Sequence, residues 1–232
     1  MFKTPVRPGL TPLEALIALA VIITAVLVVL GLLTSTFLGP RSVPAQLKDS
    51  TQVRGVLQAL VIHAQNNQDR FPLPSVVDAH DATIAGGGTA KDRTAKIFSM
   101  LINNGRVSPD LLIAINEASP RIAEYEGYEF DEPSTAARPA EALWDPAYSA
   151  DFVNGEGNIS YAHLLPGGTR KPRWANTFDT TQPVIGNRGP KISGVTYSGQ
   201  RATADFDTQS NTLLIHGSRT KWEGNVGFAD NH

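Results

Sequence analysis

The sequence predicts an α+β protein in which a long N-terminal helix, first transmembrane and then amphipathic, packs on a small antiparallel β-sheet. Helical hydrophobic spacing dominates the chain up to about residue 103, whereas short β-branched runs separated by Gly, Pro, Asn and Asp fill the last third. Helices followed by strands in this way are typical of the α+β class. A third observation, an apolar run at residues 15–33, sets the N-terminus apart.

The apolar run is long enough to cross a bilayer. Seventeen of the 19 residues at positions 15–33 are hydrophobic, only Thr24 and Gly31 interrupt them, and the 26 residues after Glu14 carry no charge. A helix of this length measures roughly 28 Å, against a hydrocarbon core of ~30 Å, and exceeds the apolar region of about 7 to 15 residues in a cleaved secretory signal. We therefore expect a retained single-pass transmembrane helix over residues 10–39.

The next elements follow from spacing and from breakers. Pro40 and Pro44 predict a break, because proline lacks an N–H group and disfavours helical geometry at the preceding residue. Apolar residues at helical spacing predict an amphipathic helix over residues 45–69, ending before the prolines of residues 71–74. A second helix is expected over residues 91–103, after a glycine loop that lacks the Lys-Ser/Thr ending of a phosphate-binding loop.

The remainder of the chain predicts irregular structure followed by strands. A short apolar element is expected over residues 108–115, and the acidic, proline-containing segment 124–146 predicts an irregular surface excursion. Five short runs have the composition of strands in an antiparallel sheet. They are residues 159–162, 183–185, 192–197, 212–216 and 225–229.

Composition excludes several kinds of function. A net charge of −2 and a pI near 6.2 give no basic footprint for nucleic acid, so we expect no nucleic-acid partner. The absence of cysteine excludes disulfides, thiolate metal sites and a cysteine nucleophile. No Gly-x-Ser-x-Gly elbow or recognisable Ser/His/Asp set indicates a catalytic residue, and we expect no enzymatic activity.

Glu14 stands at the edge of the apolar run, where a carboxylate is costly to bury without a partner. One explanation is local, because Thr11, Pro12 and Glu14 have the spacing of an N-cap, a first helical residue and a capping box. The other is an intermolecular role, in which a charge from another chain compensates the carboxylate. Spacing alone leaves both open.

The N-terminal residues resemble the class III leader of type IV pilins and type II secretion pseudopilins. The resemblance rests on Gly9, Leu10 and Glu14, with basic residues before the glycine and the apolar run after the glutamate. It implies that prepilin peptidase cuts after Gly9 and methylates Leu10, and that Glu14 pairs with the α-amine of a neighbouring subunit during filament assembly. The chain departs from the family at Leu10, where phenylalanine is usual, and at Pro12.

A resemblance to a large prepilin-type family, abundant in planctomycetes and their relatives, extends over most of the chain. Five segments carry it in the family's order along the chain, although each motif is weak alone. They are the Arg-Phe-Pro stop at residues 70–72, the glycine and Ser-Pro pair within residues 101–120, residues 158–161, residues 184–190, and the C-terminal residues 211–232.

Two groups of residues carry side chains that can bind metal ions. His216, Asp230 and His232 have side chains that suit zinc, but a hairpin would only permit, not require, their contact. Asp205, Asp207, Gln209 and Asn211 alternate oxygen-bearing side chains, so calcium is an open possibility, although the spacing does not match an EF-hand loop. Hydrogen bonding at turns and strand ends is the favoured explanation of the first group, and an exposed face of a strand or loop is that of the second, so no resident cofactor is expected.

Together these observations predict a pilin-like, pseudopilin-type subunit of a type II secretion or type IV pilus-like assembly. The expected domains are a leader at 1–9, the transmembrane assembly helix at 10–39 and an extracytoplasmic α+β head at 40–232. Its expected partners are prepilin peptidase, other pilin or pseudopilin subunits and the inner membrane, with the C-terminal domain periplasmic or extracellular. Two alternatives remain, a membrane-anchored extracytoplasmic enzyme and a tethered ligand-binding module.

Overall fold

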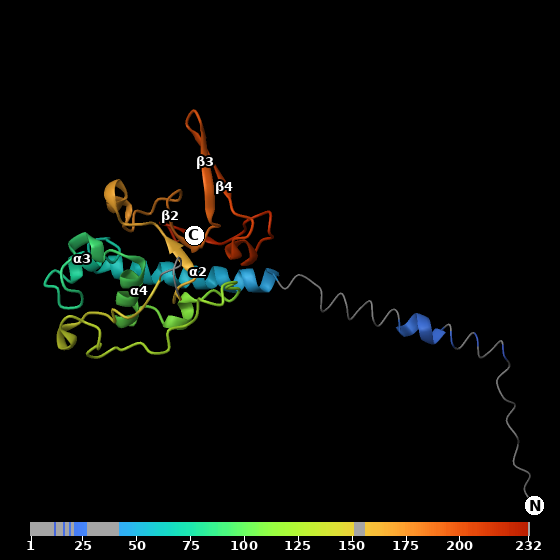
Figure 1. Cartoon of the computed structure of the whole chain (residues 1–232), viewed down its shortest axis with the longest axis horizontal. Helices are drawn as coiled ribbons and strands as arrows, with labels where there is room; N and C mark the ends of the chain where they lie inside the picture. The colour runs from blue at the N-terminus through green and yellow to red at the C-terminus, as the bar shows by residue number, and fades with distance from the viewer. Residues whose placement is uncertain are drawn as a thin grey trace, which may run out of the picture. The chain divides into compact units, whose positions relative to one another are not determined.

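The computed structural model describes residues 12, 16, 19, 21–26, 42–150 and 156–231, and of residues 42–44 the backbone alone. The chain divides into two units, Met1–Val43 and Pro44–His232, and each is described by itself. In the first unit, residues 21–26 are helical and exposed. The second unit holds every other element described below (Figure 1).

The prediction of one long N-terminal helix that is first transmembrane and then amphipathic is wrong. Within the described parts of the chain, no helix is both long enough and apolar enough to cross a bilayer. Among the described residues, the helix with sufficient length, α2 (Ser42–Gln65), carries charges such as Lys48, Asp49 and Arg54. Most of the predicted segment 10–39 lies outside the described residues.

Helix α2 runs through the head as its central element (Figure 1). It begins beside the predicted break, and Pro44 falls in its first turn, where the N–H groups have no helical acceptor and proline is tolerated. The buried face of α2 presents apolar side chains at helical spacing, which confirms the predicted amphipathic helix. These side chains are Val53, Val56, Leu57, Leu60 and Ala64.

Short helical elements follow α2 along the chain. After α3 (Pro74–Val77), the glycine loop leads into the 3₁₀ helix η1 (Gly88–Lys91) and then α4 (Thr94–Asn103). Helix α4 buries all of its large apolar side chains, which explains the periodicity that predicted it. The expected apolar element 108–115 contains the 3₁₀ helix η2 (Pro109–Leu112), and segment 124–146 is irregular apart from η3 (Pro139–Glu141), as predicted.

The described residues of the head form two antiparallel sheets. The first has the order β1-β2-β5, from Tyr161–His163, Pro183–Asn187 and Val226–Phe228. The second is the hairpin of β3 (Ile192–Ser198) and β4 (Arg201–Phe206). The 3₁₀ helix η4 (Gly168–Arg173) lies between β1 and β2. The described head is therefore α+β with small antiparallel sheets.

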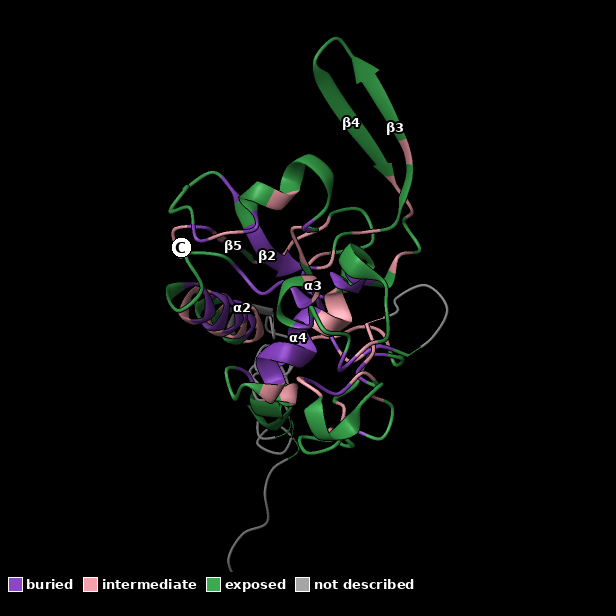
Figure 2. Ribbon diagram, turned by 90° about the vertical axis from the view of Figure 1, so that its left-hand side faces the viewer, coloured by how far each residue is buried: buried purple, intermediate pink, exposed green. Residues whose placement is uncertain are grey.

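Close approach of α2 to β5 joins the helix to the three-stranded sheet. A Cβ atom on Gly227 would lie 2.9 Å from Leu57 Cδ2 and 3.5 Å from Val53 Cγ1, so glycine leaves room for the helix. Buried residues concentrate where α2, α4 and β2 meet (Figure 2). The core of the head therefore lies between the helices and this sheet.

The structure differs from the predicted strands in two places. Residues 212–216 do not form a strand, because Asn211–Leu214 is the 3₁₀ helix η5. Leu213 and Ile215 are buried while Leu214 is 43% exposed, so the i, i+2 pattern imitates a strand. Strand β4 was not predicted, because its alternating apolar positions are mostly alanine, which has a low preference for strands.

Candidate functional site

The residues that the sequence assigns to processing and assembly lie outside the described part of the chain. These residues are Gly9, Leu10 and Glu14. His232 is also outside it. The polar centres described next belong to the head.

The first polar centre surrounds the buried carboxylate of Asp49 and is called the Asp49 centre (Asp49, Tyr161, His216 and Asn225). Asp49 Oδ2 accepts hydrogen bonds from Asn225 Nδ2 at 2.7 Å and His216 Nε2 at 2.9 Å, and Oδ1 accepts from Tyr161 Oη at 3.1 Å. The Asp49 and His216 side chains are 0% exposed. Three donors therefore satisfy one fully buried carboxylate.

The Asp49 centre joins four distant pieces of the chain. Asp49 lies on α2, Tyr161 begins β1, His216 follows η5, and Asn225 precedes β5. The Asn225 amide also donates to the carbonyl oxygen of Gln46 at 3.1 Å, so it binds α2 twice. The Asp49 centre thus connects α2 by hydrogen bonds to β1, to the residues after η5 and to the residue before β5.

The chemistry of the Asp49 centre is that of a structural link. Burial and the neighbouring Asp49 carboxylate raise the pKa of Tyr161, so its hydroxyl remains a donor at neutral pH. An Asp–His pair acts in catalysis when the second ring nitrogen faces a nucleophile or substrate. Here His216 Nδ1 is buried and has no hydrogen-bond partner within the described residues. A cavity of about 110 Å³ reaches Asn225 and Gly227, but His216 does not line it.

The candidate metal ligands that lie within the described residues form no metal site. Among the residues that the structure describes, no group of three or more His, Asp or Glu side chains could hold a metal ion. His216 is bound to Asp49, and Asp207 Oδ1 accepts the N–H of Gln209 at 2.8 Å. Asp205 lies on β4.

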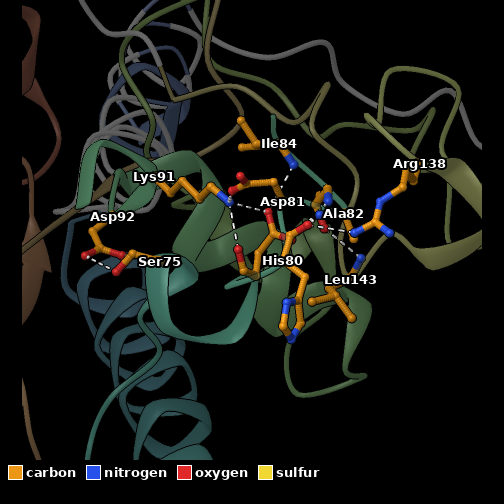
Figure 3. Close-up of polar contacts among 11 residues, drawn as sticks. Ser75, His80, Asp81, Ala82, Ile84, Lys91, Asp92, Arg138 and Leu143 are labelled. Atoms are coloured by element: carbon orange, nitrogen blue, oxygen red, sulfur yellow. Dashed lines mark hydrogen bonds and ion pairs between the residues drawn. The ribbon is translucent and has the colours of Figure 1, made fainter. Parts of the chain in front are cut away.

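The second polar centre is a buried ion cluster, called the Lys91 cluster (Lys91, Asp78 and Asp81; Figure 3). Lys91 Nζ lies 2.9 Å from Asp78 Oδ2, 2.5 Å from Asp81 Oδ1 and 2.7 Å from the Asp78 carbonyl oxygen. The side chains of Lys91 and Asp78 are 2% and 0% exposed, whereas Asp81 is 48% exposed. The ammonium is therefore enclosed by three oxygens of one loop.

The same Asp78 carboxylate organises the loop backbone. It accepts the N–H groups of Ala82 and Thr83 at Oδ1 and of Ile84 at Oδ2, at 2.7 to 3.1 Å. Burial acts to raise the pKa of Asp78, but Lys91 and these three N–H groups outweigh it and hold the pKa below its usual value. Gly87, at φ 96°, turns the chain so that η1 returns Lys91 to this carboxylate.

His163 is a further titratable group of the head. Nδ1 lies 2.9 Å from the Leu164 carbonyl oxygen, and Nε2 lies 3.0 Å from Thr94 Oγ1. Because a carbonyl oxygen only accepts, Nδ1 carries the proton and Nε2 accepts from the Thr94 hydroxyl. The ring packs on Trp174 and Phe98, with centroids 5.0 and 5.5 Å apart. Burial lowers the pKa of His163 to about 4.

The lowered pKa of His163 predicts a loss of stability in mild acid. The unfolded chain binds a proton near pH 6.5 and the folded chain only near pH 4, so stability falls as pH drops between these values. Because of this residue, the free energy of unfolding measured with urea should be about 3 kcal/mol lower at pH 4 than at pH 7. His163→Phe should make the free energy of unfolding depend less steeply on pH. Part of the dependence should remain, because burial and Arg106 also lower the pKa of His63. An unchanged slope in His163→Phe would contradict this assignment, and exposed His80→Gln is the control.

Sequence reasoning identified His216 but none of its partners. Asp49 is separated from Tyr161 by 112 residues and from His216 by 167, so no local spacing connects them. Lys91 was expected only as the first residue of a helix. Comparison of the chain with models of known families, with curated proteins and with solved structures finds no match.

Proposed function

We propose that this chain is a pilin-like, pseudopilin-type structural subunit, processed by prepilin peptidase, of a type II secretion or type IV pilus-like assembly. The observation that carries the proposal is the combination of Gly9 and Glu14, five residues apart, with 26 uncharged residues after the glutamate. Basic residues at positions 3 and 7 precede this combination, as in a class III leader.

The head supports a structural role in two ways. Its best-connected polar groups, the Asp49 centre and the Lys91 cluster, are buried and hold segments of the chain together. Helix α2 packs its apolar face against the core and approaches β5 closely at Gly227. A rigid head attached to an N-terminal assembly segment is what a filament subunit requires.

The proposal assigns a role to each N-terminal residue. Gly9 is the last residue of the leader, and Leu10 becomes the methylated N-terminus. Glu14 pairs with the α-amine of a neighbouring subunit, which compensates two charges in an apolar setting. The partners are prepilin peptidase and other pilin or pseudopilin subunits. The location is the inner membrane, with the head on its periplasmic or outer side.

Replacement of Gly9 tests the processing step. In cells that contain a prepilin peptidase, Gly9→Val should abolish cleavage, because a β-branched side chain occupies the position that the peptidase reads as glycine. The wild-type chain and the Thr4→Val variant, changed elsewhere in the leader, should both lose residues 1–9. Intact mass of each protein, extracted from membranes, gives the result directly. Normal cleavage of Gly9→Val would exclude Gly9 as the cut site.

A further inference from the structure

The β3–β4 hairpin projects from the head and pairs with no other strand of the described residues (Figures 1 and 2). Val195 and Tyr197 of β3 are 48% and 75% exposed, and β4 is exposed from Arg201 to Asp205. An isolated two-stranded hairpin is marginally stable in water, and its open edges are templates for another strand. The hairpin therefore has the properties of a docking element.

The register gives the hairpin one apolar and one polar face. Val195 pairs with Ala204 and Tyr197 with Ala202, whereas Thr196 pairs with Thr203. A register shift between Ile192 and Gly194 moves Ile192 opposite Phe206, onto the apolar face. The polar face holds Gly194, Thr196, Ser198, Arg201, Thr203 and Asp205.

The outer edge of β4 has free backbone groups at alternate residues. The loop between Ser198 and Arg201 has two residues, and Gly199, at φ 60°, occupies the first central position, where a type II′ turn requires glycine. In such a hairpin the residues that flank the loop form a hydrogen-bonded pair, so alternate residues from Arg201 onward face β3. The N–H and C=O groups of Ala202 and Ala204 consequently face outward.

This edge is complementary to itself. If β4 pairs antiparallel with β4 of a second copy about a two-fold axis at Thr203, Ala202 forms a hydrogen-bonded pair with Ala204 of the second copy. The same register places Arg201 opposite Asp205 of the second copy, and Asp205 opposite its Arg201. Neither residue has an ion pair within the described residues, and directly opposed charges of unlike sign stabilise strand pairing.

We propose that the β4 edge binds the β4 edge of a second copy of this chain, forming a two-fold symmetric, four-stranded sheet. Symmetric pairing of identical surfaces is the commonest form of dimer. The Arg201–Asp205 complementarity selects β4 over β3, because β3 carries no charged residue between Ile192 and Ser198. Across the joined strands, Tyr197 of one copy lies in one row with two small alanines and Val195 of the other.

The proposal does not depend on processing or on filament assembly. Only the hairpins meet, so the Gly9→Val chain, with its leader retained, should dimerise as the wild type does. If the wild-type chain is cleaved normally but does not dimerise, the dimer proposal alone is overturned. If it dimerises but is not cleaved, the proposed function alone is overturned.

The absence of cysteine makes a direct cross-linking test possible. Thr203→Cys in the full chain, oxidised in isolated membranes, should form a disulfide-linked dimer, because residues opposed in a non-hydrogen-bonded pair lie about 4.5 Å apart at Cα. Thr196→Cys is the matched control on the same face of the hairpin. Its two copies would be three strand spacings apart, about 14 Å, which is too far for a disulfide.

Charge reversal in the Thr203→Cys background tests the complementarity. Arg201→Asp should lower the yield of cross-linked dimer about tenfold, because it replaces two attractive pairs with two repulsive ones. Addition of Asp205→Arg should restore the yield, since the double variant exchanges the two charges. Both positions are exposed, so the head should remain folded. Equal cross-linking of the two cysteine variants, no cross-linking of Thr203→Cys, or failure of the double variant to recover would overturn the proposal.

Discussion

Replacement of Asp49 with alanine should lower the free energy of unfolding by about 3 to 5 kcal/mol, the cost of leaving buried polar partners without their acceptor. Tyr161, His216 and Asn225 all donate to this carboxylate, and its side chain is 0% exposed. The change would release α2 from β1 and β5 together. Urea unfolding of the full chain in detergent, followed by tryptophan fluorescence, measures it, since Trp144 and Trp174 are fully buried.

Two companion variants separate the Asp49 centre from a general effect on α2. Lys48→Ala changes the exposed neighbour on the same helix and should alter stability by less than about 0.5 kcal/mol. Tyr161→Phe removes one of three donors and should cost about 1 kcal/mol. If Asp49→Ala were no more destabilising than Lys48→Ala, the Asp49 centre would not hold the head together.

The Lys91 cluster gives the second large effect. Asp78→Ala should destabilise the head by about 3 to 5 kcal/mol, because it leaves a buried ammonium with one half-exposed partner. It also removes the acceptor of three backbone N–H groups, at Ala82, Thr83 and Ile84. Loop 78–92 should then open first, and hydrogen exchange at these three amides reports on that opening.

Asp81→Ala is the matched control for the same ammonium. Asp81 also binds Lys91 Nζ, but 48% of its side chain is exposed, so solvent screens this pair and its loss should destabilise the head far less than the loss of Asp78. The amides of residues 82–84 should remain protected in this variant, since Asp78 is unchanged. Equal losses in Asp78→Ala and Asp81→Ala would show that burial does not determine the strength of the cluster.

Elements with a continuous buried face could be predicted from the sequence. Helices α2 and α4 were found because their buried residues recur at helical spacing, and β1, β2 and β5 fall within or beside predicted strands. Strand β3 is exposed, but its Ile, Val, Thr and Tyr residues favour a strand and predicted it. Strand β4 was missed because its alternating apolar positions are mostly alanine, which has a low preference for strands. Residues 212–216 were misassigned because a 3₁₀ helix can also bury alternate residues.

The polar centres could not be predicted for a different reason. The Asp49 centre joins residues separated by more than 100 positions, and a single sequence carries no signal for such a contact. Asp78 and Lys91 are only 13 positions apart, and the glycines between them predict a loop, but the sequence does not show that this loop returns Lys91 to Asp78. The sequence indicates His216 as a candidate metal ligand, whereas in the structure it forms a hydrogen bond with the Asp49 carboxylate on α2.

The predicted long N-terminal helix combined two different signals. The apolar run was assigned to a transmembrane part and the amphipathic spacing of residues 45–69 to a second part, with a break expected at Pro40 and Pro44. In the structure α2 begins at Ser42 and belongs to the head. The proposed function therefore rests on the leader residues and on the organisation of the head.

The most direct test of that function is the N-terminal residue of the wild-type protein. The chain should be extracted from membranes of cells that contain a prepilin peptidase, and its N-terminal peptide identified by mass spectrometry. The account predicts a peptide that begins at Leu10 and carries one methyl group on its α-amine. A peptide that begins at Met1, in cells where other prepilins are cleaved, would contradict it.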